Sequence, residues 1–437
     1  MKTVIMAGGR GTRISSVARD IPKPMVKIDG KPILEREIEC LREQGFTDII
    51  ITISHLGHVI RDYFGDGSGF GVHIQYYNET VPLGNAGALL QLRDELTDDF
   101  FLLNADVLFD VDLDRMIRYH KRKGGDVTLF THPNSHPYDS GLLITDKNLA
   151  VKQWLTKEDD RPQYYKNRVN AGIHILNPKV LRLPVKYAEN TEKKDSLTGQ
   201  MKKLDLDRDI LKPLAGTGRM FCYDSPEYVK DMGTPERFHT VEEDFRSGRV
   251  HAKNLKNKQK AVFIDRDGTL NRYVGFLRDI EKFELTEGAA EAVKKIHQKG
   301  YLCIVVTNQP VVARGEVTFE ELERIHNKME TLLGKSGAYI DGLYVCPHHP
   351  HSGYEGEVPE LKIDCSCRKP KPGMLLQAAK DFNIILEESW MIGDSENDIQ
   401  AGKKAGCNTA LITEKNAAEF GQDRSVDSLL DFAEKLR

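Results

Sequence analysis

The stretch AVFIDRDGTLN, residues 261–271, decides how the second half of the chain is interpreted. Its apolar run AVFI is typical of a buried strand in a parallel sheet, and Asp265 and Asp267 follow at the carboxyl end of that strand. Because residues two apart in an extended backbone point the same way, we expect the two carboxylates to share one small space. Two anions this close need a cation between them, and carboxylate oxygens suit Mg²⁺. The stretch therefore predicts a magnesium site at a strand end.

Three later pieces also place polar side chains at a strand end or before a helix. They supply, in order, Thr307 with Asn308, Arg368 with Lys369, and Asp394. Asp and Gly are also common in simple strand-end turns, which is the alternative interpretation of Asp265 and Asp267. A simple turn does not account for an acid pair, a hydroxyl, a lysine and a further acid in this order, so we favour a catalytic site.

Length, charge and hydropathy narrow the class of protein. At 437 residues the chain is expected to form two or three domains. The formal net charge is −4 with both signs mixed, which argues against a nucleic-acid binder. No apolar stretch has the length of a membrane span, and the first strand, KTVIMAG, has no signal-peptide layout ahead of it. We therefore expect a cytoplasmic enzyme that contacts neither nucleic acid nor membrane.

The first strand leads into a glycine-rich loop, AGGRGTR. Gly8, Gly9 and Gly11 leave backbone N–H groups free to approach a phosphate, and Arg13 adds a bidentate cation. The spacing is not the dinucleotide-binding GxGxxG, so the loop alone is weak evidence. Lys23 follows between two prolines; a lysine in such a turn is usually only solvated, but here a phosphate is a plausible target.

Strand and helix patterns alternate through the rest of the first half. Helices are expected from residue 33, near 58–63 and over 84–96, with apolar strands between them, which predicts a doubly wound parallel α/β sheet. Asp106 follows the strand FFLLN, and Asp231 lies in a turn before a helix. Each acid alone is compatible with a turn or cap, whereas together they could hold Mg²⁺ on a nucleoside triphosphate.

Residues 1–245 resemble the sugar nucleotidyltransferases, which join a sugar 1-phosphate to a nucleoside triphosphate and release pyrophosphate. The resemblance rests on AGGRGTR, PKPM, VPLGNAGAL, LNADVLF, NAGIHILNP and DMGTPERF, in the family's order. The resemblance implies that the triphosphate binds at Gly8, Gly9, Gly11 and Arg13, and that Lys23 neutralises charge during transfer. It places the base near Glu79 and Gly84, the sugar at Asn170 and Gly172, and the sugar phosphate at Lys157. Asp106 and Asp231 would hold Mg²⁺. One departure is Thr156, where the family often has Glu before the lysine.

This inventory agrees with the chemistry of the family. A sugar phosphate is already an anion, so its oxygen attacks the α-phosphorus without a general base. Catalysis then consists of positioning and charge neutralisation, which Gly, Lys, Arg and Mg²⁺ provide.

Residues 246–259 are polar, basic and without apolar periodicity, and we interpret them as a linker between domains at 1–245 and 260–437.

Residues 260–437 resemble the haloacid dehalogenase phosphatases, a second doubly wound α/β fold. The resemblance implies that Asp265 is the nucleophile and Asp267 the acid and base, and that the phosphoryl group is held by Thr307, Asn308 and Lys369. It assigns Mg²⁺ to Asp265, Asp267 and Asp394, with Asp398 behind them. The short interval between Asp265 and Thr307 leaves no room for a large lid domain.

Two cysteine-containing motifs, CPHHP and CSC, predict a structural Zn²⁺ site. The expected ligands are Cys346, His348, Cys365 and Cys367. His349 and His351 are competing ligands, and a pair of ordinary thiols in a loop is the alternative. With DRDGTLN and TNQ these motifs resemble heptose 1,7-bisphosphate phosphatases, whose close relatives act on histidinol phosphate. Pro310 and Val311 depart from the Ser-Gly-Ile usual there, while Arg314 and Arg368 remain candidates to bind a second phosphate.

The two resemblances together imply a bifunctional enzyme. It would remove the 7-phosphate of a heptose 1,7-bisphosphate and then join the heptose 1-phosphate to a nucleotide, with GTP as the expected donor. The alternatives are a mannose 1-phosphate type of nucleotidyltransferase fused to a histidinol-phosphate-like phosphatase, and a non-catalytic sugar-nucleotide sensor that regulates the phosphatase. Small molecules are the expected partners, and the sequence leaves homo-oligomerisation open.

Overall fold

The computed structural model describes residues 1–9, 21–79, 84–182, 203–413 and 419–436, so Gly11 and Arg13 lie outside the described residues. Contacts divide the chain into two units. The first comprises Met1–His132, Gly141–Thr156 and Asn170–Asn254, and the second Pro133–Ser140, Lys157–Val169 and Leu255–Arg437. None of the described helices combines the length and the apolar character that crossing a bilayer requires.

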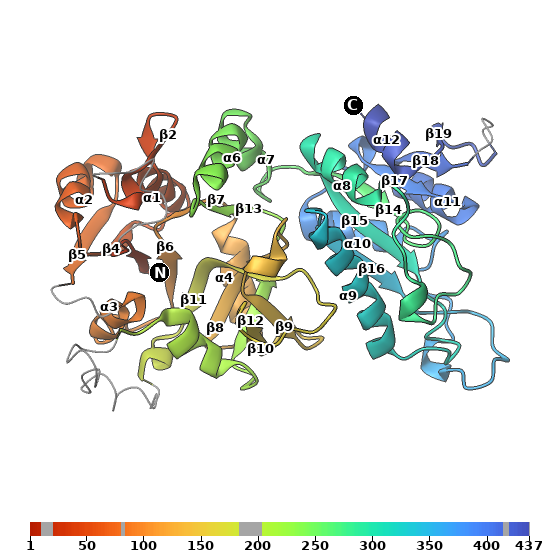
Figure 1. The fold of residues 1–437 in the computed structure, drawn as a ribbon, viewed down its shortest axis with the longest axis horizontal. Helices are drawn as coiled ribbons and strands as arrows, with labels where there is room; N and C mark the ends of the chain where they lie inside the picture. Colours follow the sequence, from red (N-terminus) through yellow and green to blue (C-terminus); the bar gives the residue numbers. More distant parts are fainter. Residues whose placement is uncertain (10–20, 80–83, 183–202, 414–418, 437) are drawn as a thin grey trace. The chain divides into compact units, whose positions relative to one another are not determined.

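The first unit is built on a sheet whose central strands are parallel (Figure 1). Its strands lie in the order β10 (Val151–Leu155), β9 (Leu142–Thr145), β11 (Val169–Leu176), β6 (Phe100–Asn104), β1 (Thr3–Met6), β4 (Asp48–Ile53) and β5 (His73–Asn78). Two further strands branch from this order: β8 (Val127–His132) pairs with β11, and β12 (Met220–Asp224) pairs with β8. β1, β4, β5 and β6 run parallel, whereas β11 is antiparallel to β6. The predicted, mainly parallel α/β sheet is confirmed, with an added antiparallel side.

Helices cover both faces of this sheet because alternate strand residues point to opposite sides. The described helices on the sheet are α1 (Ile33–Glu43), α2 (Gly57–Phe64), α3 (Asn85–Gln91) and α4 (Leu113–Lys123). Two more, α6 (Pro235–Arg246) and α7 (Arg249–Ala252), pack in a separate core of the same unit. Ile5 of β1 packs in the core formed with α1, α2 and α4, and Val4 packs in the core formed with α3. β1 is therefore buried on both faces, as its unbroken apolar run predicts.

Two short ribbons accompany the main sheet. β2 (Lys27–Ile28) pairs with β3 (Lys31–Pro32), just before α1. β7 (Val107–Asp110) pairs antiparallel with β13 (Tyr228–Asp231), which sets Asp231 opposite Val107. After α6, the short helix α7 lies within the stretch interpreted as a linker, and its Val250 is buried in the core of the first unit.

The second unit has a fully parallel sheet, ordered β16 (Gly342–Cys346), β15 (Tyr301–Asn308), β14 (Lys260–Ile264), β17 (Trp390–Gly393), β18 (Asn408–Ile412) and β19 (Arg424–Val426). The chain runs outward from β14 to β16 and then returns to β17 on the other side of β14. This reversal between β14 and β17 is the topological switch point, where ligands of open α/β sheets bind at the carboxyl ends of the strands. The stretch 261–271 begins in β14 and continues past its carboxyl end, so Asp265 and Asp267 follow the strand at the switch point.

Helices flank this sheet on both faces in the described part of the unit (Figure 1). They are α8 (Ala289–Gln298), α9 (Phe319–Lys335), α10 (Gly373–Phe382), α11 (Glu396–Ala405) and α12 (Leu429–Lys435). Val262 and Ile264 pack with α8, α9 and α12, while Ala261 and Phe263 pack with α10 and α11. The strand that carries Asp265 is thus anchored from both faces, which fixes the position of the carboxylate that follows it.

Candidate active sites

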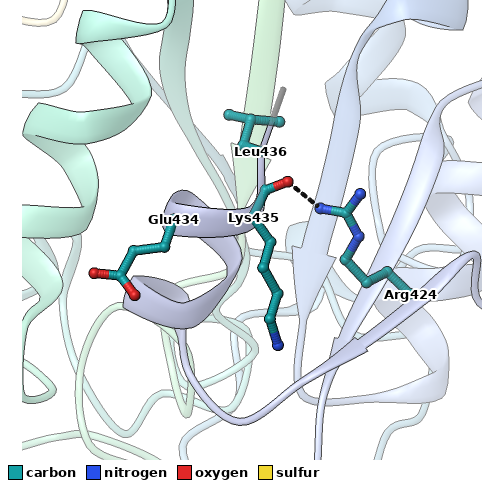
Figure 2. Close-up of a pocket in the computed structure, with 4 residues that line it drawn as sticks. All are labelled: Arg424, Glu434, Lys435 and Leu436. Carbon is teal, nitrogen blue, oxygen red and sulfur yellow. Dashed lines mark hydrogen bonds between the residues drawn. The ribbon is translucent and has the colours of Figure 1, made fainter.

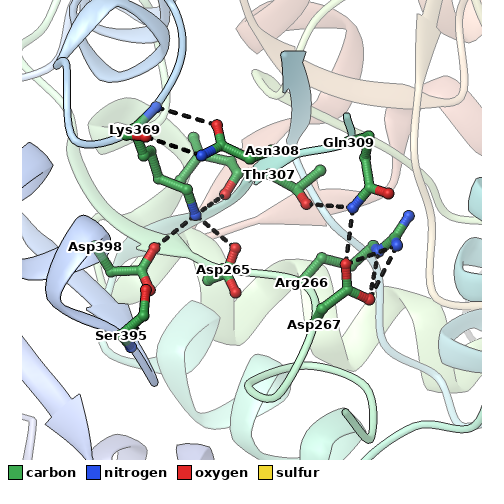
Figure 3. Close-up of polar contacts among 10 residues, drawn as sticks. Asp265, Arg266, Asp267, Thr307, Asn308, Gln309, Lys369, Ser395 and Asp398 are labelled. Carbon is green, nitrogen blue, oxygen red and sulfur yellow. Dashed lines mark hydrogen bonds and ion pairs between the residues drawn. The ribbon is translucent and has the colours of Figure 1, made fainter. Parts of the chain in front are cut away.

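Lys369 lies among the carboxylates at the switch point of the second unit (Figure 3). Its side chain is 3% exposed, and Nζ donates to Asp265 Oδ1 at 2.5 Å, to Asp398 Oδ1 at 2.6 Å and to the main-chain oxygen of Val306 at 2.8 Å. Burial alone would lower the pKa of Lys369, but the two carboxylates raise it above its usual value. The side chain is therefore a fixed ammonium with all three protons donated.

The backbone around this lysine is held by matched hydrogen bonds. Asn308, at the end of β15, accepts from the backbone N–H of Lys369 and donates to its carbonyl, both at 3.0 Å. Ser395 Oγ donates at 2.5 Å to Asp398 in the capping box that begins α11. Asn308 and Asp398, from two elements, therefore set the position of the ammonium before any ligand binds.

Three carboxylates form the candidate cation site. Oxygens of Asp265, Asp394 and Asp398 lie within 4.8 Å of one another, an all-oxygen set of the type that Mg²⁺ prefers. Burial raises the pKa of Asp394 to about 6, with Asp398 adding to the effect. Gly268 has φ +86°, and a Cβ there would lie 2.0 Å from Asp394 Oδ2, so only glycine lets the loop pass this carboxylate.

Asp267 faces a different set of partners. Figure 3 shows its carboxylate turned toward Arg266 and Gln309, whereas Asp265 points to Lys369. Asp267 still lies near enough to Asp265 to contribute to the raised pKa of that group, but its own hydrogen bonds go to the guanidinium next in the chain and to Gln309. Its catalytic role and its place on Mg²⁺ remain predictions. Thr307 lies buried beside it and accepts from Gln309 Nε2 at 2.8 Å.

The two arginines predicted to bind a second phosphate lie near His349. The Arg314 guanidinium sits between the rings of Phe276 and Tyr354, at 4.1 and 4.5 Å from their centroids, and its Nη2 is 3.4 Å from His349 Nε2. Burial lowers the pKa of His349, and the charges of Arg314 and Arg368 lower it further. Phe276 and Tyr354 were not foreseen, because an aromatic residue in a loop gives no sequence signal of its partner.

The four predicted zinc ligands come together. The Sγ atoms of Cys365 and Cys367 are 3.2 Å apart, Cys346 Sγ is 3.5 Å from Cys365 Sγ, and His348 Nδ1 lies 3.4 Å from Cys367 Sγ. Tetrahedral ligands about 2.3 Å from an ion lie roughly 3.8 Å from each other, so these donors suit Zn²⁺ with small adjustments. His349 and His351 bond to each other instead, and neither belongs to this group.

In the first unit, each of the two predicted magnesium ligands is bonded to a basic side chain. Asp231 lies opposite Val107, and therefore beside Asp106, because of the register of β13 and β7. Lys23 Nζ donates to Asp106, and Arg237 Nη1 donates to both oxygens of Asp231 at 2.9 Å. Burial pushes the pKa of Asp231 upward, but Arg237 holds it below its usual value.

The predicted base site lies at the carboxyl end of β1. Ser54 Oγ donates to the Gly8 carbonyl at 2.6 Å, and the Glu79 carboxyl group lies next to Gly8, where an added Cβ would be 3.5 Å from its Oε1. Burial raises the pKa of Glu79. Gly9 follows in the same loop, and Gly84 directly precedes α3.

The predicted sugar-facing residues lie on β11. Asn170 Oδ1 accepts from His174 Nε2 at 3.0 Å and from the Gly172 N–H at 3.3 Å, which leaves its Nδ2 protons for a ligand. Gly172 has φ +77°, and a Cβ there would lie 2.6 Å from Asn104 Nδ2, so a side chain would push β11 away from β6. Lys157 belongs to the second unit, where its side chain is exposed.

One open pocket of about 560 Å³ lies away from all these residues. Figure 2 shows its lining at α12 and β19, where Arg424 Nη1 donates to the Lys435 carbonyl at 3.0 Å. Glu434 and Leu436 complete the lining. None of these four side chains is a candidate from the sequence, and the pocket adds no chemistry to either site.

Comparison with known proteins finds two families along the chain. Residues 2–248 match the family model described as nucleotidyl transferase, and residues 213–406 match the model described as haloacid dehalogenase-like hydrolase. The solved structure of HddC from Yersinia pseudotuberculosis is 27% identical, covering 56% of this chain and 99% of its own, with a TM-score of 0.46.

Two curated relatives are phosphatases. The D-glycero-beta-D-manno-heptose-1,7-bisphosphate 7-phosphatase of Pasteurella multocida is 40% identical over 184 residues, which is 41% of this chain and 97% of the relative. The D-glycero-alpha-D-manno-heptose-1,7-bisphosphate 7-phosphatase of Burkholderia mallei is 42% identical over 155 residues, which is 36% of this chain and 80% of the relative.

Proposed function

The chain belongs to the nucleotidyl transferase family and carries a haloacid dehalogenase-like phosphatase domain, and we propose that it is a bifunctional enzyme of activated-heptose synthesis. The second domain hydrolyses the 7-phosphate of D-glycero-D-manno-heptose 1,7-bisphosphate. The first domain then transfers GMP from GTP to heptose 1-phosphate. The observation that carries the proposal is the buried Asp265, Lys369 and Asp398 cluster in a chain that covers 97% of a heptose bisphosphate 7-phosphatase.

In the phosphatase reaction, an Asp265 oxygen attacks the phosphorus of the 7-phosphate, and the bond from phosphorus to the sugar oxygen breaks. Asp267 protonates the departing sugar oxygen. Water then attacks the aspartyl phosphate and gives a proton to Asp267, which releases inorganic phosphate and restores Asp265. Lys369 donates to Asp265 before the attack; we assign it, with the buried Thr307, to the phosphoryl oxygens, for which one of its three donated hydrogen bonds would move to the phosphate.

In the transfer reaction, an oxygen of heptose 1-phosphate attacks the α-phosphorus of the nucleotide, and pyrophosphate leaves. No side chain needs to remove a proton, because the attacking phosphate is already an anion. Lys23, with Arg13 and the glycine loop, offsets the charge that accumulates. Guanine suits Glu79, since a carboxylate can bridge the two adjacent N–H donors that guanine presents on one edge.

The donor sets of the second unit fit both expected metals, whereas Asp106 and Asp231 in the first unit are bonded to Lys23 and Arg237. Mg²⁺ on Asp265 and Asp394, and on Asp106 and Asp231 in the first domain, would supply positive charge to the reacting phosphates. Zn²⁺ on the Cys346, His348, Cys365 and Cys367 set would fix the loop that leads to Lys369. We assign transfer to residues 1–245 and hydrolysis to residues 260–437, joined by residues 246–259.

The test is an incubation of the protein with Mg²⁺, heptose 1,7-bisphosphate and each nucleoside triphosphate in turn, with products identified by phosphorus NMR and mass spectrometry. We expect heptose 1-phosphate and, with GTP, GDP-heptose. Asp265→Asn should stop phosphate release and leave transfer to supplied heptose 1-phosphate intact, and Asp106→Asn should do the reverse. A product that keeps its 7-phosphate and has a free anomeric hydroxyl would refute the proposed order of reactions.

A further inference from the structure

Arg266, the residue between the two acids of the quoted stretch, is completely buried. Its guanidinium binds the Asp267 carboxylate with Nε and Nη2, at 2.7 to 3.1 Å. On its other side, Nη1 lies 3.0 Å from Nε2 of His326 in α9. Since a guanidinium only donates, His326 Nε2 is the acceptor and its ring is neutral.

This contact leaves Arg266 little freedom to move. A buried guanidinium that loses a partner costs several kcal/mol, so Arg266 stays where both Asp267 and His326 satisfy it. His326 is 6% exposed and lies in the interior of the 17-residue helix α9. Its ring is therefore held in place and fixes the position of the guanidinium. The result is a line of three side chains, from α9 through Arg266 to the Asp267 carboxylate.

Two amides complete the surroundings of Asp267. Asn271 Nδ2 donates to Oδ1 at 3.1 Å, and Gln309 Nε2 donates to Oδ2 at 2.8 Å. Gln309 also donates to Thr307 Oγ1 at 2.8 Å, so the position of the acid is tied to that of a phosphate-binding candidate. Both carboxylate oxygens are thus aligned by donors from three places in the chain.

We propose that Arg266 and His326 are positioning residues that set the orientation in which Asp267 exchanges protons with the departing sugar oxygen and with the attacking water. The proposal rests on the phosphatase function above. In the first step the phosphorus–oxygen bond of the substrate breaks and the sugar oxygen takes its proton from Asp267; in the second, Asp267 takes a proton from water. A misplaced Asp267 would slow a step that needs its proton and leave other steps unchanged.

Comparing two substrates with different leaving groups distinguishes a positioning role from a general loss of stability. A sugar alkoxide leaves only with a proton, whereas p-nitrophenolate is a stable anion that leaves without one. We would therefore measure release of the leaving group in a single turnover for both heptose bisphosphate and p-nitrophenyl phosphate. In His326→Leu, which removes the acceptor, we expect release from the sugar substrate to fall about 100-fold, the size of effect that misplacing a general acid produces. Release of p-nitrophenolate should change less than about threefold, because it needs no proton.

Two further variants complete the experiment. His326→Gln places a carbonyl oxygen near the former Nε2 and should restore most of the lost rate on the sugar substrate. His297→Gln is the matched control, since His297 is a partly buried histidine of the same unit, bonded at 2.7 Å to Asp341 at the opposite end of β15. It should affect both substrates equally.

Arg266→Met should show the same selective loss as His326→Leu. If Arg266→Met fails to fold, the comparison of His326→Leu with His326→Gln tests the positioning role. Equal loss on both substrates in His326→Leu, or no loss, would overturn the positioning role. A wild-type protein that releases phosphate from neither substrate would instead overturn the phosphatase function, and this inference with it.

Discussion

Replacing Lys369 with methionine tests the centre of the phosphatase site. Methionine keeps most of the side-chain volume but removes the ammonium that donates to Asp265, Asp398 and Val306. With Lys369 3% exposed and Asp398 1% exposed, water cannot replace it easily. The variant therefore leaves two buried carboxylates without their shared cation.

The structure sets the expected size of the effect. Each hydrogen bond to a charged group contributes about 1.5–3 kcal/mol, and deletion of one partner of a buried ion pair costs about 3–5 kcal/mol in total. We expect Lys369→Met to lower the free energy of unfolding of the second unit by about 4 kcal/mol at pH 8 without Mg²⁺. Phosphatase activity should also be lost, because we assign this lysine to the phosphoryl group.

The loss should depend on pH with a definite sign. Burial already raises the pKa of Asp265, and removal of Lys369 raises it further. A carboxyl group whose pKa is higher in the folded state binds a proton on folding, so its penalty is absent below the unfolded pKa and grows as the pH rises through the gap. Since the pKa of Asp265 is raised to about 8 even with Lys369 in place, the added destabilisation should be nearly constant from pH 5 to pH 7 and grow as the pH rises above 8, by up to about 1.4 kcal/mol per pH unit.

The assay uses the two tryptophans of the chain. Trp154→Phe leaves only Trp390, in β17, so that urea unfolding followed by fluorescence in EDTA reports the second unit. Lys328→Met is the matched control: Lys328 is 7% exposed but donates at 2.8 Å to the Ile280 carbonyl rather than to a buried carboxylate. A loss from Lys369→Met no larger than the control's, or one that increases toward pH 5, would refute the reasoning.

Three other predictions follow from the site and the fold. Arg368→Ala should raise KM for heptose bisphosphate at least tenfold with little change for p-nitrophenyl phosphate, measured by phosphate release; equal effects would exclude a clamp on the second phosphate. Cys365→Ser should remove zinc and impair hydrolysis, and elemental analysis that finds no zinc in the unmodified protein would contradict the site. Burial, with Asp106 nearby, raises the pKa of Glu37 well above its usual value, so the stability of the first unit should fall as pH rises from 5 to 8 and Glu37→Gln should flatten that slope. Urea unfolding of Trp390→Phe, which leaves Trp154 as the reporter, would measure it.

Much of the fold follows from strand ends and apolar runs. AVFI is the core of β14, the helix expected from residue 33 begins there, and Asp265, Asp394 and Lys369 meet at one edge of the sheet. These features are local in sequence, or follow from the rule that parallel strands end at a common edge. The cysteine and histidine cluster also followed from spacing, although only the structure distinguishes His348 from its neighbours.

Other features depend on contacts that spacing does not contain. β11 is antiparallel to β6, because pairing direction is set by connections and not by the composition of a strand. The helix expected over 84–96 ends at Gln91, after which the chain turns. Asp265 and Asp267 were expected to share one small space, but spacing did not reveal that Arg266 in the same stretch binds Asp267 and is itself in contact with His326, sixty positions away. A rule based on alternation gives the direction of a side chain from its backbone; it does not reveal a neighbouring charge that competes for it.

Both candidate sites also share a property that no single motif displays. Lys23 binds Asp106 in the first unit, and Lys369 binds Asp265 in the second. Each reaction adds negative charge at a phosphorus atom, and a cation already in position costs no reorganisation when that charge develops. In the second unit Lys369 also retains its proton, since the carboxylates of Asp265 and Asp398 raise the pKa of its ammonium. The carboxylates of the second site thus have two uses: they are the candidate cation ligands, and they keep Lys369 charged and fixed in position.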